Sequence, residues 1–113
     1  MEIIYNNIFP FKGYLAMCVF PFIFVRKDAR ALKTTDINHE MIHGKQQIEM
    51  LWVLFFVWYG IEWFVRWVAY GFDGHLAYRN ISFEREAYSN QSNITYLDER
   101  KPYAFLKYLT KNN

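Results

Sequence analysis

One short motif, His39-Glu40-Met41-Ile42-His43, constrains this chain more than any other feature. Side chains four residues apart lie on the same face of an α-helix, so His39 and His43 can bind one metal ion. Glu40 follows the first histidine directly and can reach a water molecule on that ion. The motif therefore predicts a helix here, a Zn²⁺ site with both histidines as ligands, and Glu40 as the catalytic base.

Length and composition limit the remaining possibilities. The chain has 113 residues, which predicts a single domain over residues 1–113. Its net charge is only +2, and no cluster of lysines and arginines forms a phosphate-binding track, so nucleic acid is excluded as a partner. The single cysteine, Cys18, cannot form an internal disulfide and leaves the redox compartment open.

No signal peptide is recognisable at the N-terminus. Residues 1–5 contain no basic side chain, and Pro21 interrupts the apolar run of residues 14–25. The location expected from the sequence is therefore cytoplasmic or membrane-associated.

The pattern of residues predicts a mainly α fold with a short N-terminal β element, which is the α+β class. Residues 14–25 have the composition of one or two short strands split by Pro21, after an irregular lead-in over residues 1–13. Thr34-Thr35-Asp36 offers caps for the motif helix, which should begin near Asp36. Four further helical stretches are expected: 61–70, 83–91 with Ser82 as its cap, 96–100 and 103–109.

A catalytic zinc ion usually has three protein ligands, so one must come from outside the motif. Glu84 and Glu86 lie at the start of a predicted helix, and at about 200° apart only one of them can face the metal. His75 is an alternative third ligand, a hydrogen-bond donor to the transition state, or an ordinary loop residue. Four side chains near Glu84 could stabilise an oxyanion, and the sequence does not choose among them: Tyr78, Arg79, Arg85 and Tyr88.

The motif followed some forty residues later by Glu84-Arg85-Glu86-Ala87 resembles the gluzincin metallopeptidases. In that clan the third ligand is a glutamate within a Glu-x-x-Ala-Asp pattern, so the resemblance implies that Glu84 is the ligand and Glu86 is not. Tyr88 stands where many members have the aspartate that orients a ligating histidine. The resemblance implies a minimal zincin-like domain that binds Zn²⁺ and acts on a peptide or protein substrate.

Chain length places a condition on this site. A straight helix from His43 to Tyr70 would end about 40 Å away, too far for Glu84 to return if residues from 76 onward are helical. The metal site therefore predicts a reversal between Met50 and Tyr70, with Gly60 as its natural position. The result would be a helical hairpin between the active-site helix and a second ligand-bearing helix.

The apolar region 50–70 also bears on partners. Glu62 and Arg66 lie within it, at the spacing of a helical ion pair, and make a membrane crossing costly. The aromatic region 50–70 is therefore expected to attach to a membrane surface, to contact a second copy of the chain, or to form a heavily aromatic core.

Three functions remain open. The first is a zinc-dependent metallopeptidase-like hydrolase, in which Glu40 activates a zinc-bound water and an extended substrate pairs with the strand near residues 20–25. The second is a non-catalytic metal-binding relative. The third is a small membrane-associated interaction protein in which the motif is accidental; it predicts a helix straight through Gly60 and Glu84 far from His43.

Overall fold

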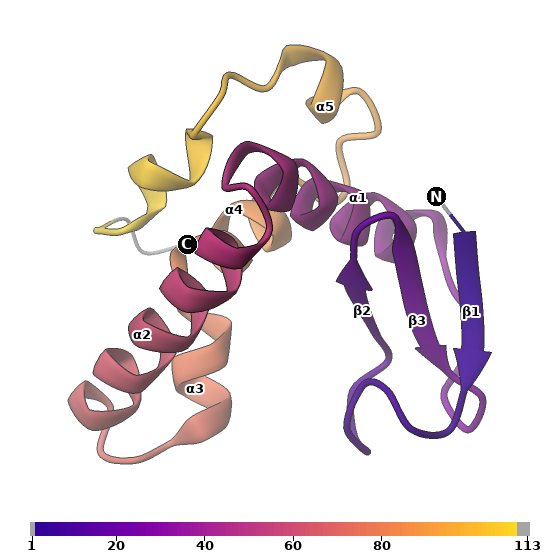
Figure 1. Ribbon diagram of the computed structural model, residues 1–113, viewed down its shortest axis with the longest axis horizontal. Coiled ribbons are helices and arrows are strands. Elements are labelled where there is room, and N and C mark those ends of the chain that lie inside the picture. Colours follow the sequence, from indigo (N-terminus) through magenta and orange to yellow (C-terminus); the bar gives the residue numbers. More distant parts are fainter. Residues whose placement is uncertain (1, 111–113) are drawn as a thin grey trace.

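The computed structural model describes residues 2–110, and it has the predicted α+β class. Figure 1 shows a small sheet on one side, helices α2 (Val53–Ala69) and α3 (Gly74–Arg79) on the other, and α1 (Thr34–Glu49) between them. The metal motif lies in α1, so the element that carries the chemistry also joins the two sides.

The sheet has three strands in the order β1 (Glu2–Asn6), β3 (Phe22–Arg26), β2 (Ala16–Val19). The split at Pro21 is confirmed, because β2 and β3 form an antiparallel pair on either side of it. The irregular lead-in is wrong for residues 2–6, which form β1: its backbone pairs in parallel with β3 and hydrogen-bonds along the outer edge of that strand. Consequently β3 is the central strand, and β2 forms the sheet edge next to the helices.

Helix α1 begins two residues before the expected start at Asp36. The Asp36 carboxylate accepts a hydrogen bond from the Lys33 backbone N–H at 2.8 Å and pairs with the Arg30 guanidinium at 2.7 Å. These contacts satisfy the first turn and set the helix start. The helix buries a polar face, since His39, Glu40 and His43 are all less than 9% exposed.

The predicted reversal exists, but its expected position at Gly60 is wrong. The chain turns at residues 50–52, where α1 and α2 meet at a bend of 112°. Leu51 and Trp52 take left-handed backbone conformations there, with φ of 55° and 57°. The Trp52 N–H donates to the Gln47 carbonyl at 2.8 Å, which closes the end of α1 without a glycine. Gly60 lies inside the continuous α2 helix.

The C-terminal half returns to the motif. Helix α4 (Ser82–Asn90) confirms the helix predicted over residues 83–91, and α5 (Tyr96–Glu99) and the 3₁₀ helix η1 (Ala104–Tyr108) follow it. Ser82 is the first residue of α4 rather than its cap, and its N–H and hydroxyl both donate to the Glu62 carboxylate at 2.6 Å.

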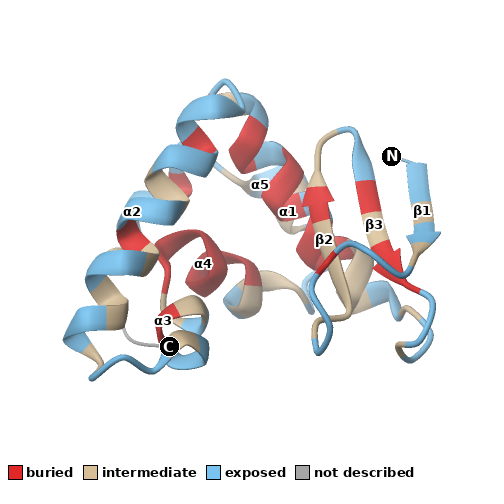
Figure 2. Cartoon of the chain, turned by 60° about the horizontal axis from the view of Figure 1, so that its bottom comes forward, coloured by how far each residue is buried: buried red, intermediate tan, exposed pale blue. Residues whose placement is uncertain are grey.

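Helix α4 is the most deeply buried element, as Figure 2 shows. Phe83 extends from it into an aromatic core with Phe55 and Phe105, at ring-centroid distances of 4.5 Å and 4.4 Å. Aromatic rings at these separations bury large apolar areas, so a few of them can hold a small domain together. The core fixes α4 against α2 and places its first turn beside α1.

Among the described residues no single helix is long and apolar enough to cross a membrane, although the bent pair of α1 and α2 passes that test as a pair.

Candidate metal site

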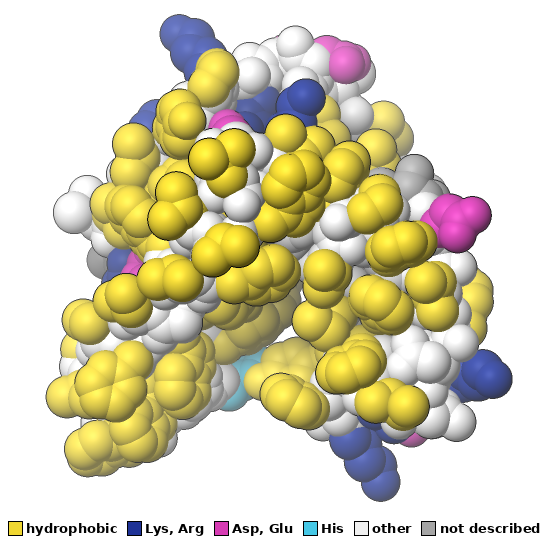
Figure 3. Space-filling model, in the orientation of Figure 1, with side chains coloured by type: hydrophobic (Ala, Val, Ile, Leu, Met, Phe, Trp, Pro, Cys, Tyr) yellow, Lys and Arg dark blue, Asp and Glu magenta, His cyan; other side chains and the backbone are white. Residues whose placement is uncertain are grey.

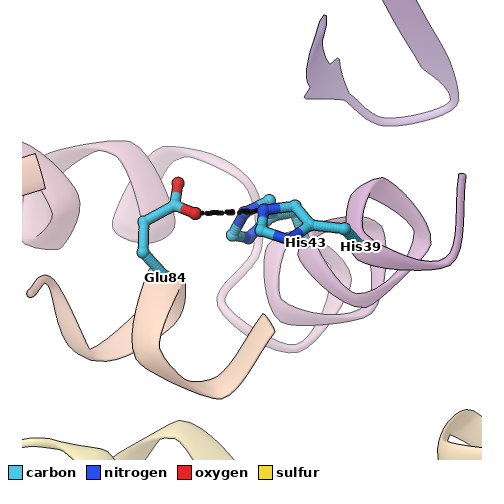
Figure 4. Close-up of side chains that lie close together, drawn as sticks. All are labelled: His39, His43 and Glu84. Atoms are coloured by element: carbon cyan, nitrogen blue, oxygen red, sulfur yellow. Dashed lines mark hydrogen bonds and ion pairs between the residues drawn. The ribbon is translucent and has the colours of Figure 1, made fainter. Parts of the chain in front are cut away.

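Three side chains that sequence reasoning selected converge on one point. Glu84 Oε1 lies 3.1 Å from His39 Nε2 and 3.0 Å from His43 Nε2, and the two nitrogens are 3.1 Å apart (Figure 4). All three side chains are buried. The cluster could therefore hold a metal ion. The hypothesis of an accidental motif makes two predictions. The prediction that Glu84 lies far from His43 is wrong, because their side chains are 3.0 Å apart. The prediction of a helix straight through Gly60 is confirmed.

The size of this triangle matches a small tetrahedral ion. Metal–ligand bonds of about 2.0–2.1 Å place the ligand atoms of a tetrahedral zinc site about 3.3–3.4 Å apart. The three atoms here form edges of 3.0–3.1 Å, so outward shifts of about 0.2 Å would admit such an ion.

His43 is held in one tautomer by Gln46. The Gln46 amide nitrogen donates to the Phe83 carbonyl at 3.1 Å and to the Glu86 carboxylate at 2.9 Å. Its carbonyl oxygen must therefore face His43 Nδ1, 2.8 Å away, and accept a hydrogen bond from it. In the neutral ring that a metal ion requires, Nδ1 carries that hydrogen, so Nε2 presents its lone pair to the point shared with His39 and Glu84.

His39 has an equivalent partner in Gln91. The Gln91 side-chain oxygen lies 2.8 Å from His39 Nδ1. The Asn38 side chain fixes the loop that carries Gln91, since it donates to the Gln91 carbonyl at 2.9 Å and to the Asn93 carbonyl at 3.0 Å. An amide oxygen therefore faces His39 Nδ1, and the Tyr88 ring packs against His39 at a centroid distance of 4.5 Å.

Glu86 orients the site from behind. It accepts hydrogen bonds from Gln46, from the Tyr96 hydroxyl at 2.7 Å and from the Arg100 guanidinium. Arg100 also binds both carboxylate oxygens of Glu49, at 2.7 Å and 3.0 Å. A relay of buried polar groups therefore runs from Arg100 through Glu86 and Gln46 to His43.

The charges of the metal-free site are coupled. Burial opposes protonation of His43, but the charge of Glu84 and their hydrogen bond outweigh it and raise the pKa of His43 to about 9. Burial would raise the pKa of Glu84, but His43 and the hydrogen bonds of both histidines hold it well below its usual range. The second oxygen of Glu84 accepts from the Tyr59 hydroxyl at 2.7 Å. Without metal, the site is thus an imidazolium–carboxylate pair.

A cleft of 570 Å³ leads to these residues. Glu40, His43 and Glu84 line it, together with apolar side chains from β2, from the loop after β1 and from α2. Burial raises the pKa of Glu40, and the neighbouring histidines lower it again in part. A second hollow, of 730 Å³ between α2 and Leu109, contains none of the three clustered residues.

The other candidate residues differ in whether they reach the cleft. Tyr78 lines the cleft, with its hydroxyl 3.3 Å from that of Tyr88. Arg79 lies over the Tyr88 ring at 3.6 Å, and Arg85 donates to the Tyr108 carbonyl at 2.9 Å, so both serve packing. His75 is exposed on α3 and stands outside the metal cluster among the described residues.

Compared with family models, curated proteins and solved structures, the chain matches none of them.

Proposed function

We propose that this protein is a zinc-dependent peptide hydrolase with His39, His43 and Glu84 as metal ligands and Glu40 as the base. One observation carries the proposal: two oriented imidazoles and a carboxylate form a triangle of zinc dimensions, and a buried glutamate beside them lines the same cleft. Two nitrogen ligands with one oxygen ligand suit Zn²⁺, and three protein ligands leave a position for reaction.

Zinc bound at these three residues would supply a Lewis acid that polarises a carbonyl and lowers the pKa of water. Glu40 takes the proton of the attacking water and delivers it to the leaving amine. Burial raises the pKa of Glu40, which makes its carboxylate a stronger base for the first transfer. Of the four oxyanion candidates, Tyr78 is the one that lines the cleft. Its hydroxyl donates a hydrogen bond to the substrate carbonyl oxygen as negative charge develops there.

An extended substrate would lie along β2. The strand near residues 20–25 was expected to pair with it, but β3 is central and both its edges are used. The Leu15 carbonyl accepts from Arg26 N–H, so the backbone of Ala16 turns the opposite way, towards the outer edge of β2. Gln47, on the motif helix, already binds the Cys18 carbonyl and the Phe20 N–H on that edge at 2.7 Å each, so a substrate would pair at Ala16.

Zinc stoichiometry by elemental analysis is the first test. Wild type should carry about one zinc per chain, and His43→Ala and Glu84→Ala should lose it, because a site of three ligands binds weakly with two. Glu40→Gln should keep the metal and lose peptide hydrolysis. Absence of zinc from wild type after metal is supplied would refute the hydrolase. Zinc that is retained without hydrolysis of any peptide in a broad library would instead establish the non-catalytic metal-binding protein.

A further inference from the structure

The outer face of α2 is a continuous apolar stripe. At 100° per residue, its members fall within an arc of about 120°. Each is between 49% and 69% exposed: Val53, Leu54, Val57, Ile61, Phe64, Val65 and Val68. Four of the nine aromatic residues of region 50–70 turn the other way, since Phe55 is buried and Trp58, Tyr59 and Trp63 pack against the core. The stripe is thus mainly aliphatic and has no polar side chain.

The sheet has a second apolar surface. Ile23 and Val25 are buried on one face of β3, so Phe22 and Phe24 lie on the other. The strand register adds three apolar neighbours to that open face, Ile4, Met17 and Val19, and places the exposed Glu2 beside Phe22 at its end. None of the five apolar side chains is buried. Apart from Glu2, these residues form an apolar surface that cover would stabilise.

The loop after β1 adds a third surface beside the open sheet face. Ile8, Phe9 and Phe11 are 70%, 50% and 78% exposed, and the Phe9 ring lies 6.2 Å from that of Phe24. Together the stripe, the open sheet face and this loop form what we call the apolar face. Figure 3 shows one face of the molecule, with hydrophobic side chains on its left and on its right and a hollow between them.

We infer that the apolar face docks on the surface of a lipid bilayer. Specific protein interfaces carry about one hydrogen bond per 100–200 Å², and the α2 stripe offers no side chain to make one. The apolar face forms two ridges separated by a hollow: the α2 stripe, and the open sheet face with its loop. A second copy of the chain would also have to fit both of them. A fluid apolar layer needs neither hydrogen bonds nor a matching shape, and it covers both ridges at once.

Charge at the edge of the face supports the same occupant. Lys12 follows Phe11 directly and is exposed, and the exposed Lys27 binds the Asn6 carbonyl through its backbone N–H at 2.9 Å. Two lysines therefore border the apolar loop, where their ammonium groups can reach anionic headgroups while the phenylalanines enter the acyl region.

Vesicle flotation tests the inference, using phosphatidylcholine vesicles with and without phosphatidylglycerol. Wild type should float with both and more strongly with the anionic lipid. Ile61→Glu on the stripe and Phe11→Glu on the loop should each lower the partition coefficient about tenfold, since each places a charge in the acyl boundary. Ile94→Glu is the matched control: Ile94 is 71% exposed, belongs to neither ridge, and its variant should bind as wild type does.

Circular dichroism must show the same fold in each variant. No flotation of wild type, or equal loss in Ile94→Glu, would overturn the inference. So would a concentration-dependent dimer in sedimentation that Ile61→Glu abolishes, because the occupant would then be a second copy. The assay runs equally on His43→Ala, so failure to bind vesicles is separate from failure of the zinc hydrolase.

Discussion

Zinc binding to this site should release a proton from His43 and depend steeply on pH. The Glu84 carboxylate raises the pKa of His43 to about 9 in the metal-free protein, whereas the free side chain has a pKa of 6.5. Zinc requires the neutral ring, so it competes with that proton. At pH 7, about two units below the folded pKa, the competition weakens zinc binding about 100-fold, or about 2.7 kcal/mol.

The measurement is a competition titration against a zinc indicator between pH 7 and pH 8, corrected for the proton affinity of the indicator. Apparent affinity should rise about tenfold across that unit of pH. Imidazole NMR of the metal-free protein gives the independent check. The His43 ring should remain protonated at pH 8 in wild type and should be neutral at that pH in Glu84→Gln. A pH-independent affinity would refute the ion pair and the reasoning built on it.

The raised pKa of His43 also determines how the free energy of unfolding changes with pH. Because the folded pKa of His43 is raised, its contribution of about 3 kcal/mol is complete below pH 6.5 and is lost as pH rises through about 9, which urea unfolding of the metal-free protein can measure. Tyr59→Phe removes the hydrogen bond to Glu84 and should weaken zinc binding about 10–100-fold in the competition titration, without loss of fold. Arg100→Met leaves Glu86 and Glu49 without their cation and should cost about 3–5 kcal/mol in urea unfolding, against about 1 kcal/mol or less for Arg30→Met at a half-exposed pair. Gly60→Ala should raise the free energy of unfolding by about 0.5–1 kcal/mol, since a Cβ there meets open space within a continuous helix; a loss of stability would mean that α2 bends at this point.

The selection of His39, His43 and Glu84 was possible from sequence because helical spacing is local. Residues four apart share a face whatever the fold, and chain length alone required a reversal before Glu84. The position of that reversal was not readable. It uses Leu51 and Trp52 in left-handed conformations, which are held by contacts such as the hydrogen bond from Trp52 to Gln47 and the packing of the Trp52 ring near Phe20.

The residues that orient the ligands were missed for a different reason. Gln46, Gln91 and Arg100 belong to no recognisable motif. Their roles depend on pairings between residues far apart in the chain, such as Gln46 with Glu86 and Arg100 with Glu49. A buried arginine beside two carboxylates leaves no periodic trace in a sequence. The strand β1 was missed likewise, since a short apolar stretch becomes a strand only when β3 is there to pair with it.

The relay from Arg100 to His43 also sets an order of assembly. A chain is synthesised from its N-terminus, so the motif helix leaves the ribosome before Glu84, and Glu84 leaves before Arg100. Until Arg100 has emerged, Glu86 lacks the cation that holds it, and Gln46 lacks the fixed carboxylate that turns its oxygen towards His43. The two histidines therefore reach their final orientation only after Arg100 has been synthesised. A metal ion that needs this orientation would bind after that point and would not guide the folding of the earlier segments.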